Sequence, residues 1–156
     1  GQYVFTVVSS SRIRSVTWNG QDYTNKPFDA SAGIDFTDVA VTLTTMSNEV
    51  TGSVMARDPI RPGETIVVIF PVEREQWERY GLSPARLKWT ALTSTAEYRF
   101  RDLPAGDYYV AGIPAEWVET WKSPDALSRI LAFAVRVSVG WSGKTTQHVP
   151  MVPLKR

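Results

Sequence analysis

The chain has 156 residues with 43% hydrophobic and 21% charged side chains, a balance that is typical of a soluble globular protein and excludes a disordered one. Its formal net charge of +1 gives no reason to expect nucleic acid as a partner, and no apolar run is long enough to predict membrane insertion. The absence of cysteine excludes disulfides, thiolate metal ligands and a cysteine nucleophile.

The first 46 residues are predicted to contain three strands. Alternating bulky residues favour strands over residues 3–8, 14–18 and 39–44. The second strand ends at Asn19-Gly20, a dipeptide that favours a tight hairpin turn, and the polar residues 22–31 are predicted to be a loop. Three strands alone make a marginal sheet, so residues 1–46 are interpreted as a partial β-sandwich or as the C-terminal part of a preceding domain.

From Asn48 onward, strand-like units recur at short spacing with turn signals between them, as in a β-sandwich. Residues 65–72 are apolar on both faces and are predicted to form a central strand. A helix is expected after Ser123-Pro124, because serine caps a helix and proline suits its first turn. The predicted fold class is all-β: an Ig-like or transthyretin-like sandwich of about seven strands with one short helix over residues 47–156, after the partial sandwich of residues 1–46.

The strongest fold signal is the run of residues 98–111, Tyr-Arg-Phe-Arg-Asp-Leu-Pro-Ala-Gly-Asp-Tyr-Tyr-Val-Ala, which is predicted to form a hairpin. Proline fixes one turn dihedral and glycine permits positive φ, so Pro104-Ala-Gly106 suits a tight connection. Tyr108 is the predicted central anchor of the core. A second hairpin turn is predicted at residues 140–144, before a last strand over residues 145–152.

Three segments of this second part, Glu49-Val-Thr-Gly-Ser-Val54, Ile66-Val-Val-Ile-Phe-Pro71 and Leu103-Pro-Ala-Gly-Asp-Tyr-Tyr-Val110, resemble the carboxypeptidase regulatory-like domain. This family is a transthyretin-like β-sandwich of bacterial extracytoplasmic proteins, and the resemblance covers residues 48–153. Residues 16–24 and 39–43 resemble the segment that often closes the preceding sandwich in large bacterial proteins. The resemblance implies an extracytoplasmic location, protein partners and no catalysis.

Candidate catalytic and metal-binding residues are few. His148 is the only histidine and has no serine-nucleophile motif beside it, so a structural role is favoured, and neither an enzyme nor a cofactor is predicted. Four acids in and after one loop offer oxygen ligands of the kind that calcium takes, but their spacing fits no EF-hand, and solvated loop acids are the favoured interpretation. These acids are Asp22, Asp29, Asp35 and Asp38.

The six tryptophans are divided by their predicted positions. Trp18, Trp89 and Trp117 fit packing within strands or a helix. The candidate ligand or partner contacts are Trp77, Trp121 and Trp141, which are expected near the surface, where an exposed ring can stack on a sugar or a protein. The alternative is that these rings only cover the ends of the sandwich.

Two functions are considered. The first is a non-catalytic structural or interaction module of an extracytoplasmic assembly. Strands of residues 1–46 would then pair with other domains of a parent chain, dock on the complete domain, or be shared with another copy, and open-ended sharing makes a filament. The alternative is a carbohydrate-binding module that uses exposed tryptophans to bind a polysaccharide.

Overall fold

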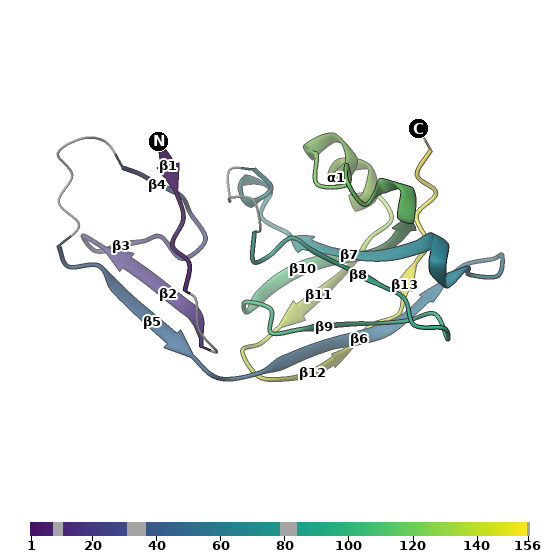
Figure 1. The fold of residues 1–156 in the computed structure, drawn as a ribbon, viewed down its shortest axis with the longest axis horizontal. Helices are drawn as coiled ribbons and strands as arrows, with labels where there is room; N and C mark the ends of the chain where they lie inside the picture. Colours follow the sequence, from purple (N-terminus) through teal and green to yellow (C-terminus); the bar gives the residue numbers. More distant parts are fainter. Residues whose placement is uncertain (8–10, 31–36, 79–83, 156) are drawn as a thin grey trace. The chain divides into compact units, whose positions relative to one another are not determined.

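The computed structural model describes residues 1–7, 11–30, 37–78 and 84–155, which form an all-β protein, as predicted (Figure 1). The chain divides into two compact units. Unit 1 comprises Gly1–Met46 with Glu78–Pro84, and unit 2 comprises Ser47–Trp77 with Ala85–Arg156. No helix among the described residues has the length and apolar character needed to cross a membrane.

Unit 1 contains two small antiparallel sheets. Its strands are β1 (Gln2–Tyr3), β2 (Arg12–Trp18), β3 (Gln21–Asp22), β4 (Phe28–Asp29) and β5 (Ala40–Thr44). One sheet has the order β3-β2-β5, and the other pairs β1 with β4. The predicted turn at Asn19-Gly20 is confirmed, since both residues have the positive φ that a two-residue hairpin needs. The strand predicted for residues 3–8 is shorter than expected, and β3 and β4 contain residues from the predicted loop.

Unit 2 is a sandwich of two sheets, and residues 115–131 form a helical layer on one of them, as Figure 1 shows. Its elements are β6 (Asn48–Met55), η1 (Pro62–Glu64), β7 (Thr65–Pro71), η2 (Arg74–Gln76), β8 (Lys88–Ala91), β9 (Glu97–Arg101), β10 (Gly106–Pro114), η3 (Ala115–Trp117), α1 (Pro124–Leu131), β11 (Val135–Val139), β12 (Gly143–Thr146) and β13 (Val149–Pro150). The first sheet has the order β11-β10-β7-β8. In the second sheet, β6 pairs with β9 on one side and with β12 and β13 on the other.

The first sheet is covered on both faces. All seven residues of β7 are buried, which confirms the predicted central strand. Val67 and Ile69 pack toward the second sheet, whereas Val68 and Phe70 pack with the helical layer. Helix α1 begins where predicted, because the Ser123 side chain accepts a hydrogen bond from the backbone nitrogen of Ala126.

The two predicted hairpins in this unit are wrong: both segments are crossovers between the sheets. β9 pairs with β6 in the second sheet, whereas β10 pairs with β7 and β11 in the first. Residues 140–144 likewise lead from β11 to β12, which pairs with β6. The physical reason is burial, because Tyr98 and Tyr108 enter one core from opposite sheets, and strands joined side by side could not enclose it.

Tyr108 is confirmed as a core anchor. It is fully buried, and its hydroxyl donates a hydrogen bond to the backbone oxygen of Pro104 in the crossover. The guanidinium of Arg86 lies over its ring, 4.6 Å from the ring centroid. A buried tyrosine hydroxyl requires such a partner, and this bond holds the bend that the chain makes between the two sheets.

Both crossovers are fastened to the start of β6 by the buried side chain of Asn48. Its Nδ2 donates to the backbone oxygens of Leu103 at 2.6 Å and Gly140 at 2.7 Å. Its Oδ1 accepts from the backbone nitrogen of Leu103 at 2.9 Å. One amide therefore satisfies three backbone groups that the two crossovers leave without strand partners.

The C-terminal segment, residues 143–155, ties the two sheets together. Its strands β12 and β13 run parallel to β6. The segment then leaves β6, and the backbone nitrogen of Val152 donates to the backbone oxygen of Gly112 in β10 at 2.8 Å. Val152 and Leu154 are buried with the helical layer, so this one segment contacts every layer of unit 2.

The C-terminal segment approaches β6 closely at Gly52. A Cβ atom added to Gly52 would lie 1.9 Å from the backbone oxygen of Gln147 and 3.0 Å from the ring of Tyr98. The same Gln147 oxygen accepts a hydrogen bond from the Tyr98 hydroxyl, and burial raises the pKa of that hydroxyl. Because glycine has no side chain, Gly52 allows the backbone of Gln147 to lie directly against β6.

Substitution of Asn48 by aspartate tests the amide that fastens the crossovers. We expect Asn48→Asp to lower the free energy of unfolding by about 3 kcal/mol, because the buried carbonyl of Leu103 and the partly buried carbonyl of Gly140 lose their donor and then face a carboxylate. Urea unfolding followed by tryptophan fluorescence measures the change. Ser47→Ala is the control, since it removes only the exposed bond from Ser47 to Asp102. A loss no larger than that of the control would contradict the assignment.

Substitution of Gly52 by alanine tests the close approach. We expect Gly52→Ala to lower the free energy of unfolding by about 3 kcal/mol, because the new methyl group would meet backbone and ring atoms. Gly63→Ala is the matched control, since a Cβ atom there meets nothing within 4 Å. Thermal unfolding by circular dichroism compares the two, and similar melting temperatures would show that the crossing at Gly52 is not tight.

Candidate functional site

Trp77 and Trp121 are not surface residues, so their predicted location is wrong. Trp77 is only 7% exposed, and its indole nitrogen donates to the backbone oxygen of Pro71 at 2.8 Å. Trp121 is fully buried in the core between the helical layer and the first sheet. That face of the sheet carries Val68 and Phe70, so apolar side chains must cover it, and the two rings supply part of the cover.

Trp141 lies in the crossover between β11 and β12 and is half-buried, rather than standing at a hairpin tip. Trp89, which was predicted to pack, is 46% exposed on the edge strand β8. Two of the three predicted tryptophans thus offer no open face to a sugar or a protein. The sequence pattern misplaced Trp89 because alternation along a strand does not reveal whether a neighbouring layer covers it.

His148 lies on the outer face of the second sheet, where its Nδ1 is 2.8 Å from Ser53 Oγ. The backbone nitrogen of Ser53 also donates to this Nδ1, at 3.2 Å. The pair lies in a shallow groove with Glu97 and Arg99, but within the described residues no carboxylate is hydrogen-bonded to His148. A serine–histidine catalytic pair needs a third group that orients the imidazole. The observed contacts instead fasten the C-terminal segment to β6.

Charged side chains on the same outer face gather around Glu49. Its carboxylate lies 2.6 Å from Arg99 Nε, 3.7 Å from Arg101 Nε and 3.9 Å from Lys144 Nζ. These residues come from β6, β9 and β12, so the cluster bridges three neighbouring strands. All three cations are more than half exposed, and each such pair is worth at most about 1 kcal/mol. The cluster favours the observed strand register and leaves the face polar.

The loop acids of unit 1 do not assemble a metal site in the part of the chain that the structure describes, where no group of three or more potential ligands occurs. Asp22 accepts hydrogen bonds from the backbone nitrogen and the hydroxyl of Thr24, and these bonds lower the pKa of Asp22. Asp29 lies 3.5 Å from the N-terminal amine. Asp35 falls outside the described residues. The bonds of Asp22 therefore stabilise the local turn.

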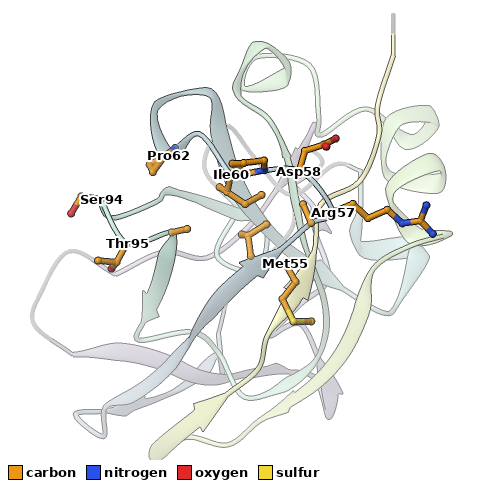
Figure 2. A pocket seen from close by; sticks show the side chains of 11 residues that line it. Met55, Arg57, Asp58, Ile60, Pro62, Ser94 and Thr95 are labelled. Carbon is orange, nitrogen blue, oxygen red and sulfur yellow. The ribbon is translucent and has the colours of Figure 1, made fainter.

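A hollow of roughly 660 Å³ lies at the end of the sandwich where β6 finishes. Figure 2 shows the side chains that line it, with Ser94 and Thr95 on one side and Arg57 on the other. Met55 contributes an exposed apolar side chain to the same hollow. Asp58 is the one carboxylate among its lining residues, so the hollow lacks the paired acids that general acid–base hydrolysis of a glycoside requires.

The best candidate interaction surface is β5 of unit 1. This strand pairs with β2 on one side, and its other edge has no partner strand among the described residues. Val41 and Leu43 are 45% and 46% exposed, although both belong to the apolar face of the strand. Their cross-strand partners are Val16 and Ile13, which a β-bulge keeps on one face. The sequence predicted the strand, but the exposure of its apolar face is known only from the fold.

No family model, no curated protein and no solved structure matches this chain. The resemblance of residues 48–153 to the carboxypeptidase regulatory-like domain therefore stays a prediction.

Proposed function

We propose that this chain is a non-catalytic structural and interaction module of an extracytoplasmic assembly, and that it associates with a second copy of itself through β5. The observation that carries the proposal is the combination of two features of β5: an edge that no described strand pairs with, and the exposed apolar side chains of Val41 and Leu43. The extracytoplasmic location rests on the resemblance of residues 48–153 to a family of such proteins.

An edge strand with an apolar face is suited to receive another strand. Its unpaired backbone groups can extend the sheet into a partner, while its side chains lose contact with water. Val41 and Leu43 are each about half exposed, so covering both contributes roughly 2 kcal/mol of hydrophobic free energy, in addition to the backbone hydrogen bonds. This is a modest contribution, which fits an assembly held by repeated contacts.

The two units differ in how completely their sheets are covered. In unit 2, the central strand β7 is buried on both faces and the first sheet has a helical cover. In unit 1, four of the five residues of β5 are exposed. Among the described residues, five of the eight large hydrophobic side chains that stay exposed belong to unit 1, and two of these five, Val41 and Leu43, lie together on β5. Pairing of β5 with β5 would give a closed dimer, and pairing with a different edge would give an open filament.

Charge substitutions on β5 test this function. In sedimentation velocity experiments, we expect the unaltered chain to associate more as its concentration rises. The double variant Val41→Lys with Leu43→Lys is expected to remain monomeric, because a charged lysine side chain is costly to remove from water. Thr42→Lys is the control, since it places a single lysine on the opposite face of the same strand and is expected to leave association intact; Val41→Lys alone matches its charge and is expected to weaken association.

Two results would contradict the proposal. A chain that stays monomeric at every concentration would exclude self-association. Association that survives the double lysine substitution would exclude β5 as the surface. Circular dichroism of each variant establishes that the strands still form, and the size of the complexes distinguishes a dimer from a filament.

A further inference from the structure

We propose that unit 2 is a force-bearing module whose strand arrangement resists tension applied along the chain between Ser47 and Lys155. The proposal concerns unit 2 alone and goes beyond the association through β5. The proposed function enters at one point: a second copy bound to β5 of unit 1 would be the partner that applies the tension.

The first and last strands of unit 2 lie side by side and point in the same direction. Asn48 pairs with Gly143 at one end of β6, and Met55 pairs with Pro150 at the other. The chain therefore enters unit 2 beside the start of β12 and leaves β6 at the opposite end. An eight-residue strand spans roughly 25 Å, so the two points at which tension acts are separated along the strand axis.

This arrangement determines how the hydrogen bonds carry a load. Bonds between strands run across the strand direction, slanted in a parallel pair. Tension that pulls β6 and the C-terminal segment in opposite directions along their axes loads all the bonds between them at once, in shear. Tension applied to both strands at the same end would open the bonds one after another, and each would fail at a low force.

The contacts within this pair resist sliding. The backbone nitrogen of Gln147 donates to Thr51 O at 2.8 Å, and that of Met151 donates to Met55 O at 3.0 Å. Between them, the carbonyl of Gln147 lies against Gly52, where a Cβ atom would stand only 1.9 Å away. Sliding the strands past each other would break these bonds together and drive side chains into the contact at Gly52.

Side chains reinforce the pair from both faces. On the outer face, His148 Nδ1 contacts the hydroxyl and the backbone nitrogen of Ser53. On the inner face, the hydroxyl of buried Tyr98 donates to the Gln147 oxygen. These contacts lie in the middle of the pair, where shear must break them at the same time as the ladder bonds.

The end of the segment is also anchored, beyond β6. The backbone nitrogen of Val152 donates to Gly112 in the first sheet at 2.8 Å, and Leu154 is only 6% exposed. Arg129 of α1 donates to the backbone oxygen of Lys155 at 2.6 Å. Val149 and Val152 are fully buried, so water has little access to the last part of this path.

Pulling single molecules of the full chain in two directions tests the proposal. The chain has no cysteine, so introduced pairs give unique attachment points. Thr45→Cys with Lys155→Cys applies tension along β6 and the C-terminal segment, and leaves most of unit 1 outside the loaded path. Arg57→Cys with Lys155→Cys applies it to the same end of both strands. All three positions are exposed.

We expect the first pair to unfold at a force several-fold higher than the second at the same pulling speed, because only the first loads the bonds in shear. Urea unfolding of the two variants without handles is expected to give equal midpoints, which establishes that the difference comes from direction and not from stability. Equal forces in the two directions, or a lower force for the first pair, would overturn the proposal.

Discussion

The parallel pairing of β6 with the C-terminal segment is the contact on which unit 2 depends. It joins the beginning of the unit to its end, and the segment continues from β6 to the first sheet and the helical layer. Gly52 permits the close approach at its centre, and Asn48 fastens both crossovers at its start. Since residues so far apart in sequence hold one another, unit 2 is expected to unfold as a single cooperative body.

Burial of the strands is distributed unevenly between the two units. In unit 2, the central strand β7 is buried on both faces and the capped helix α1 packs on its sheet, although Met55, Trp89 and Phe133 stay exposed. Unit 1 has small sheets and leaves Val41 and Leu43 half exposed on β5, whose outer edge has no partner within the described part of the chain. Val41 and Leu43 therefore give unit 1 apolar surface that association can still bury.

The polar groups of unit 2 form a continuous outer face on its second sheet. Glu49 holds charged side chains from both neighbouring strands, and Ser53 holds His148. Such cross-strand pairs favour one register over others, because a shift of one residue would bring like charges or core side chains onto this face. The residues that first suggest chemistry are thus part of the architecture of the sheet.

The sequence by itself determined those features that depend on near neighbours. The double-sided apolar run of β7, the Ser123 cap and the Asn19-Gly20 turn follow from local stereochemistry and periodicity. Only the tertiary structure decided which strands pair. Alternation shows which side of a strand is apolar but not which strand lies beside it. The connection between β9 and β10 is therefore a crossover, although its turn chemistry suits a hairpin. The burial of Trp121 was likewise decided by a layer distant in sequence.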